Sequence, residues 1–225
     1  MGHRREWVDC SAVTESHSAR PDDAAAPLTI VVLASGTGSL LQSMLDTLDP
    51  ARVRVAAVGS DKDCEALKRA DEAGIPSFQV PFDAAARADR AGWDATLLAA
   101  VREHRPDFVV SAGFMRILGQ GFIDAFPDRI VNTHPALLPS FPGAHAVPDA
   151  LAHGVKVTGT TVHIVDAGVD TGPILAQEAV VVEDGDTVDT LHERIKIVER
   201  RLLVDVLHTI SERGITRDGR KAKFS

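Results

Sequence analysis

Two polar residues, Asn132 and His134, stand two positions apart where an apolar run gives way to a proline-rich segment. On an extended chain, residues two apart project to the same side, so both side chains would face one region. An Asn amide can donate a hydrogen bond to a developing oxyanion, and a His can serve as acid, base or charged donor. The alternative is local, because both residue types often bond the backbone of their own loop. The pair alone does not decide between the two interpretations.

A third candidate, Asp170, lies in the glycine-flanked segment 166–173. A carboxylate close to His134 would raise the pKa of the imidazole and fix its orientation. The alternative is that Asp is simply a common turn residue. Two more histidines are ambiguous: His163 is typical of a satisfied core histidine, and His145 could contact a substrate or cap its loop.

A glycine-rich turn follows the first apolar run, with the sequence Ser35-Gly36-Thr37-Gly38-Ser39. Glycines at such a turn let backbone N–H groups approach a phosphate at a helix N-terminus. A dinucleotide fingerprint would require a small residue at position 41, where this chain has Leu41, and the Walker lysine is also missing. The turn therefore indicates phosphate rather than NAD or ATP, and a plain strand-to-helix turn remains the alternative.

Several other classes of chemistry find no support. There is no Gly-x-Ser-x-Gly elbow, and Cys10 and Cys64 have neither metal-ligand spacing nor a place beside the candidate residues. The net charge of −8 and the lack of a basic run before the extreme C-terminus argue against a nucleic-acid partner. No apolar stretch approaches the roughly 18 residues of a membrane span. Two cysteines give no disulfide framework, so we expect a reducing, cytoplasmic location.

The elements that must position these residues alternate between apolar runs and helical patterns, which is typical of an α/β fold. We expect a Rossmann-like, mostly parallel twisted sheet with helices on both faces and an antiparallel C-terminal strand pair. In such sheets, ligands bind beyond the carboxyl ends of the strands, where the candidate residues lie. The expected strands are 28–33, 53–58, 77–80, 107–112, 130–133, 157–165 and 174–182, and the expected helices 39–48, 63–73, 89–104, 147–153 and 188–210.

Composition also predicts the limits of the folded part. Residues 1–27 are rich in Ala, Ser, Asp and Arg without periodicity, so we expect a disordered N-terminal extension. Residues 28–213 would form a single domain, and residues 214–225 a flexible C-terminal tail.

Four separated motifs in this order resemble the phosphoribosylglycinamide formyltransferase family. They are the turn 35–39, the segment AGFMRIL (112–118), the segment NTHPALLPSFPG (132–143) and the segment HIVDAGVDTGP (163–173). The resemblance extends over about residues 28–210. It implies a formyltransferase fold and transfer of the formyl group of 10-formyltetrahydrofolate, a co-substrate, to the primary amine of glycinamide ribonucleotide, in purine biosynthesis and without a metal. It allows a homodimer.

The resemblance also implies roles for individual residues, and one departure from the family pattern. Many members have Asn where this chain has Leu40, which puts a side-chain contact to phosphate in doubt but leaves the backbone donors. The implied residues are Asn132, His134 and Asp170 for catalysis; Gly38, Ser39 and Leu40 for the substrate phosphate; Met115, Pro135 and Glu199 for the substrate amine and ribose; and Arg116, Ile117, Leu118, Asn132, Val165, Asp166 and Asp170 for folate.

Related enzymes share the Asn-x-His pair and the distal Asp. A methionyl-tRNA formyltransferase is disfavoured by the acidic charge and by the lack of an appended RNA-binding domain. A formyltetrahydrofolate deformylase is disfavoured because 27 residues leave no room for its N-terminal regulatory domain. The Phe-Pro-Gly ending at 141–143 and the phosphate turn favour the purine enzyme over a sugar formyltransferase. A nucleotide-binding oxidoreductase domain is the rival from another class, and Leu41 speaks against it.

Overall fold

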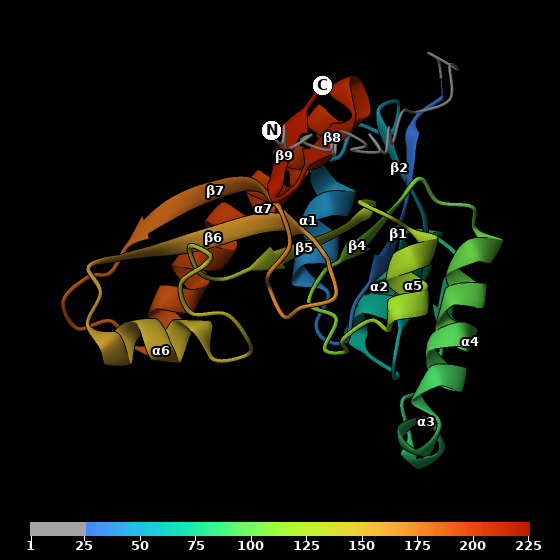
Figure 1. Cartoon of the computed structure of the whole chain (residues 1–225), viewed down its shortest axis with the longest axis horizontal. Helices are drawn as coiled ribbons and strands as arrows, with labels where there is room; N and C mark the ends of the chain where they lie inside the picture. The colour runs from blue at the N-terminus through green and yellow to red at the C-terminus, as the bar shows by residue number, and fades with distance from the viewer. Residues whose placement is uncertain (1–25) are drawn as a thin grey trace, which may run out of the picture.

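The structure, a computed structural model, describes residues 26–225, and its strands form one nine-stranded sheet (Figure 1). The strands follow the order β3-β2-β1-β4-β5-β6-β7-β9-β8 across the sheet. They are β1 (Leu28–Leu33), β2 (Val53–Ser60), β3 (Ser77–Gln79), β4 (Phe108–Ser111), β5 (Ile130–His134), β6 (Val157–Ile164), β7 (Ile174–Val181), β8 (Ile215–Asp218) and β9 (Lys221–Phe224).

Seven helices connect the strands in the described part of the chain. They are α1 (Ser39–Thr47), α2 (Glu65–Glu72), α3 (Ala84–Ala88), α4 (Arg90–Glu103), α5 (Gln120–Ala125), α6 (Ala146–His153) and α7 (Val188–Arg213). None of the helices within residues 26–225 is long and apolar enough to cross a membrane.

The sheet changes direction at the site-bearing strand. From β3 to β5 the neighbouring strands are parallel, whereas β6 runs antiparallel to both β5 and β7. The expected α/β fold, with its antiparallel C-terminal strand pair, is therefore confirmed. Because β1, β4 and β5 are parallel neighbours, the segments that follow them emerge at one edge of the sheet.

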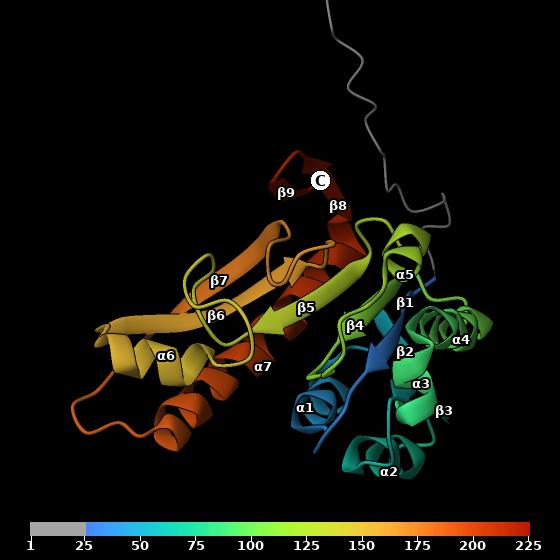
Figure 2. The ribbon, with the colours of Figure 1, turned by 60° about the horizontal axis from the view of Figure 1, so that its bottom comes forward.

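Alternation along each strand divides the core between two faces. In β1, Ile30 and Val32 belong to the cluster covered by α1, α2 and α7, whereas Val31 and Leu33 belong to the cluster covered by α3, α4 and α5. Figure 2 shows these two sets of helices on opposite sides of the sheet. A third, smaller cluster joins α6 to the first turns of α7 beneath β7. The apolar runs are continuous because both faces of the strands are buried.

The structure corrects the expected flexible tail at 214–225. This segment forms the hairpin β8–β9, which extends the sheet and buries Ile215 in the core, where Ala222 and Phe224 also pack. The short helices α3 and α5 were also not predicted. The expected disordered extension lies outside the described residues, apart from its last two positions.

Candidate active site

The end of β5 presents Asn132 and His134 on the same side, as two-residue spacing predicts. The amide nitrogen Nδ2 of Asn132 lies 3.2 Å from Nε2 of His163, its register partner on the antiparallel strand β6. His134 is buried, and its Nε2 lies 2.8 Å from the carbonyl oxygen of Phe141, at the far end of the proline-rich loop. That loop therefore folds back over β5 and holds the Nε2 edge of the imidazole.

Asp170 completes the cluster by accepting contacts on both carboxylate oxygens. Oδ2 accepts a hydrogen bond from the backbone N–H of Gly143 at 2.7 Å and lies 3.3 Å from Nδ1 of His134. Oδ1 lies 3.6 Å from Nε2 of His163. Asp170 has φ of 54°, a left-handed conformation that a non-glycine residue rarely adopts, so surrounding contacts must hold it. The neighbouring His163 is the main cause that lowers its carboxyl pKa, and the Gly143 N–H and the charge of His134 act in the same direction.

The pKa of His134 reflects two opposing influences, burial and the neighbouring Asp170. Burial lowers the pKa of His134, although the charge of Asp170 and the Phe141 carbonyl act in the opposite direction. Asp170 acts in the expected direction, but desolvation of the buried imidazolium outweighs it, so the net shift is downward. The carbonyl contact requires a proton on Nε2, so the titrating proton is the one on Nδ1, which faces Asp170.

Because the pKa of His134 is lower in the folded chain, we expect the free energy of unfolding to depend on pH. In the unfolded chain His134 has the ordinary histidine pKa of about 6.5, whereas in the folded chain its pKa is lower. The contribution is therefore present above about pH 6.5 and is lost as pH falls through the folded pKa. We expect the free energy of unfolding to fall by up to about 1.4 kcal/mol per pH unit below about pH 6.5.

Urea midpoints measured across this range for the wild type and for His134→Asn test the expectation. The variant should lose less stability on acidification. His192, whose pKa burial also lowers, titrates in both proteins and serves as the internal control. Equal losses in both proteins would assign the acid sensitivity elsewhere.

A cavity of about 330 Å³ opens beside the cluster. Asn132, His163 and Asp170 line it, whereas His134 does not. Its walls are largely apolar with a few polar groups at one end, which suits a flat heterocycle. The other lining residues are Ser111, Phe114, Met115, Arg116, Ile117, Leu118, Gly143, Ala144, Val165, Asp166, Gly168 and Val169. All the residues that the resemblance implies for folate lie on this wall.

Arg116 lines the cavity, and contacts with Asp61 and Phe82 hold its side chain in place. Its Nε donates to Oδ2 of the fully buried Asp61 at 2.7 Å, and its guanidinium lies 4.5 Å from the centre of the Phe82 ring. Ionic and cation–π contacts together restrict its rotamers. Its chain neighbours Met115 and Ile117 also line the cavity and are largely exposed, so this lip of the site is apolar and open.

The glycine turn lies between the end of β1 and the start of α1. Gly38 has φ of 68°, and a Cβ atom there would lie 2.8 Å from Cα of Ala66, so no other residue fits without displacement of α2. Arg69 clamps the turn, because its Nε donates to the Thr37 carbonyl at 2.8 Å. Leu40 is buried in the core, so only its backbone N–H remains available to a phosphate.

Two of the remaining implied residues lie apart from the catalytic cluster. The carboxylate of Glu199, on α7, is hydrogen-bonded to Thr133, whose side chain points to the opposite face of β5 from Asn132 and His134. Burial raises the pKa of Glu199. Neither Glu199 nor Pro135 lines the cavity. His145 is exposed at the start of α6 and makes no capping hydrogen bond there.

Sequence reasoning missed two residues that organise the site. His163 is a buried histidine, as its sequence context suggested, but it also joins Asn132 to Asp170. Ser35 links the glycine turn to the cavity wall, since its Oγ accepts a hydrogen bond from the backbone N–H of Met115 at 2.9 Å. The role of His163 depends on the strand register that places it opposite Asn132, and the sequence alone does not reveal that register.

Comparison with known proteins shows which family the chain belongs to. Residues 28–207 match the family described as formyl transferase. A phosphoribosylglycinamide formyltransferase from Mycobacterium tuberculosis is 58% identical over 198 residues, which cover 88% of this chain and 91% of that protein.

Solved structures agree. The crystal structure of glycinamide ribonucleotide transformylase 1 from Symbiobacterium toebii superposes with a TM-score of 0.82 at 41% identity, covering 88% of this chain and 94% of that one. A formyltetrahydrofolate deformylase from Pseudomonas syringae pv. tomato has a TM-score of 0.81 at 28% identity, covering 89% of this chain and 67% of that one. The fold is thus shared between the two enzymes, whereas the stronger sequence likeness is to the first. The chain belongs to the formyl transferase family, among its phosphoribosylglycinamide formyltransferases.

Proposed function

We propose that this site transfers the formyl group of 10-formyltetrahydrofolate to the primary amine of glycinamide ribonucleotide, giving formylglycinamide ribonucleotide. The observation that carries the proposal is the convergence of Asn132, His163 and Asp170 on one end of an apolar cavity. The glycine turn after β1, at the same edge of the sheet, supports a phosphate-bearing second substrate. Amine attack on a formyl carbon needs no protein nucleophile, which agrees with the lack of a nucleophile motif in the sequence.

Asn132 is suited to stabilise the charge that develops. As the amine nitrogen bonds to the formyl carbon, the carbonyl electrons move to oxygen and form an oxyanion. The Nδ2 group of Asn132 has two protons, and the contact with His163 uses one of them. The other can donate to the oxyanion at the cavity wall.

Asp170 is suited to move the proton. The amine must lose a proton after attack, and N10 of the folate must gain one as its bond to the formyl carbon breaks. Asp170 reaches the cavity with a carboxylate that is ionised, because hydrogen bonding lowers its pKa. It can accept the proton and return it to the leaving nitrogen through water. His134, whose Nδ1 faces Asp170, supplies a second ionisable position for the same proton.

Glu199 is proposed to bind the amine or ribose of the ribonucleotide. We expect Glu199→Ala to raise KM for the ribonucleotide about tenfold or more, since a hydrogen bond to a charged group is lost, with a small change in kcat. Steady-state kinetics with each substrate varied in turn provides the measurement. Glu193→Ala, an exposed carboxylate on the same helix, is the matched control. An unchanged KM would remove Glu199 from the substrate site.

The reaction is tested by the release of tetrahydrofolate from 10-formyltetrahydrofolate with and without glycinamide ribonucleotide. Release that requires the ribonucleotide supports the proposal. Equal release in its absence would indicate the deformylase reaction instead. A thermal shift with a folate analogue and none with NAD(P) would further exclude an oxidoreductase use of the glycine turn.

The wider setting is part of the same proposal. The net charge of −8 supports small-molecule substrates rather than nucleic acid as partners. The two substrates belong to cytoplasmic metabolism, which supports that location. A homodimer is part of the proposal, and the molar mass in solution tests it.

A further inference from the structure

The loop between β6 and β7 holds the strained residue Asp170, and part of its support comes from within. Oδ1 of Asp166 accepts hydrogen bonds from the backbone N–H of Gly168 at 3.1 Å and from Oγ1 of Thr171 at 2.6 Å. These contacts tie the entry of the loop at Asp166 to the side chain of Thr171 near its exit. A residue with positive φ persists only where its surroundings determine the backbone, so the exit of the loop needs support as well.

The exit of the loop is held by the C-terminal hairpin. Nη2 of Arg220, at the hairpin turn, donates to the carbonyl oxygen of Thr171 at 3.1 Å, directly after Asp170. Lys221 pairs with Ile174, the first residue of β7. Between these contacts Gly172 is packed so closely that a Cβ atom would lie 1.8 Å from the Ile164 carbonyl oxygen. The chain from Asp170 to Ile174 therefore runs between the hairpin and the end of β6.

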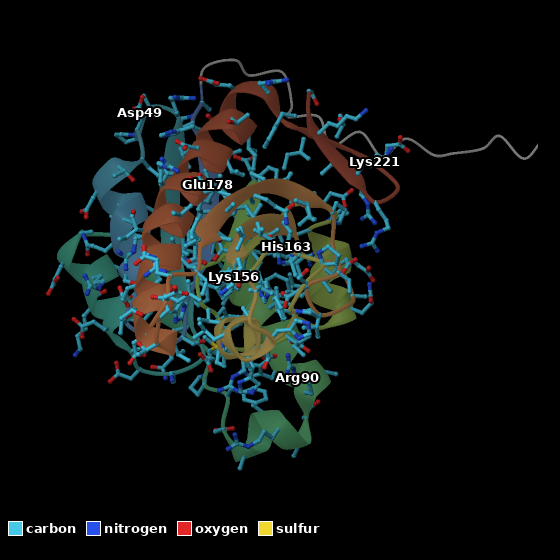
Figure 3. All side chains as sticks on the ribbon, turned by 90° about the vertical axis from the view of Figure 1, so that its left-hand side faces the viewer. Asp49, Arg90, Lys156, His163, Glu178 and Lys221 are labelled. Carbon is cyan, nitrogen blue, oxygen red and sulfur yellow. The ribbon has the colours of Figure 1, made fainter. Side chains whose placement is uncertain are left out.

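The hairpin has its own anchors, which do not involve this loop. Ile215 is buried, and Phe224 packs against the same core cluster. Nη1 of Arg217 lies 2.8 Å from Oδ1 of Asp128, and Nε of Arg213 donates to the carbonyl of Ser225 at 3.0 Å. Figure 3 shows Lys221 on this hairpin at one edge of the molecule, with His163 nearer the centre. A fixed hairpin can thus serve as a reference point for the loop.

We propose that the C-terminal hairpin is a brace for the catalytic loop and that Arg220 is its positioning residue. By holding the Thr171 carbonyl, Arg220 keeps the Asp170 carboxylate within reach of His134 and of the Gly143 N–H. The proposal rests on the role proposed above for Asp170. Loss of this one hydrogen bond lets the loop relax, so that kcat falls while KM for the ribonucleotide does not change.

The test compares Arg220→Ala, Arg220→Lys and the control Lys223→Ala, an exposed cation on the same hairpin. We expect kcat to fall about 3- to 10-fold in Arg220→Ala, to be largely restored in Arg220→Lys, and to stay at the wild-type value in Lys223→Ala. A kcat in Arg220→Ala equal to that of the control would overturn the proposal that the hairpin braces the loop.

A second readout does not depend on turnover. The Gly143 amide proton is bonded to Asp170, so its hydrogen-exchange rate reports the position of the carboxylate. We expect faster exchange at Gly143 in Arg220→Ala, with unchanged exchange in β1 and β4. Unchanged exchange at Gly143, or an increase that is equal throughout the sheet, would overturn the inference even if the wild type proved inactive with glycinamide ribonucleotide. Inactivity of the wild type, with the local exchange effect present, would instead overturn only the proposed function.

Discussion

Replacing Asp170 by Asn is expected to lower kcat by about 10²- to 10³-fold while KM for both substrates changes little. The carboxylate accepts from Gly143 on Oδ2 and faces His134 and His163 on its two oxygens. An Asn has the same shape but only one acceptor oxygen, so its NH₂ group must face one of these partners. It also cannot take up the proton that the attacking amine releases.

Single-turnover and steady-state rates for Asp170→Asn measure this loss directly. Asp184→Asn, an exposed carboxylate before α7, is the matched control for a change of one charge. The lowered pKa of Asp170 means that its ionised form stabilises the fold, so the variant should be less stable. A thermal melt therefore checks that the variant is still folded at the assay temperature. Turnover close to the wild-type value would show that proton transfer does not pass through Asp170.

Replacing Asn132 by Ala is expected to lower kcat by about 10²- to 10³-fold, the usual cost of removing one oxyanion donor. Asn132 lines the cavity, and its Nδ2 is oriented by His163, so one of its protons is available at a fixed position. This preorganisation is why the loss should appear in kcat rather than in KM. The substitution leaves His163 beside Asp170, which limits the damage to the rest of the cluster.

The measurement is again kcat and KM for each substrate, with Ser140→Ala on the following loop as the control. Ser140 is exposed and its side chain lies away from the cavity wall. If Asn132→Ala raised KM for folate and left kcat unchanged, the amide would be a binding group rather than an oxyanion donor.

Much of the fold followed from local patterns. Continuous apolar runs alternating with helical segments predicted the parallel half of the sheet, and the two-residue spacing predicted that Asn132 and His134 share a side. Both follow from short-range geometry, because side-chain direction in a strand depends only on position. The proximity of Asp170 was different, since it lies 36 positions beyond His134 in the sequence. Only the family resemblance connected the two.

The errors had identifiable causes. The hairpin at the C-terminus carries the dipeptide Asp218-Gly219, a hairpin signal that the charged composition around it obscured. The contact between Asn132 and His163 depends on the register of an antiparallel pair, which one sequence does not reveal. The pKa of His134 could not be predicted either, because the sign of its shift depends on the balance between burial and one nearby carboxylate.

The central claim is that the substrate amine takes the formyl group directly from the folate, at a site organised by Asn132, His134 and Asp170. It is tested most directly with 10-formyltetrahydrofolate labelled with ¹³C in the formyl carbon, incubated with the protein and glycinamide ribonucleotide and observed by NMR. The account predicts that the label appears as the formamide of formylglycinamide ribonucleotide, at a rate that Asp170→Asn lowers by about 10²- to 10³-fold. Label recovered as free formate, or transfer at the same rate in the variant, would contradict it.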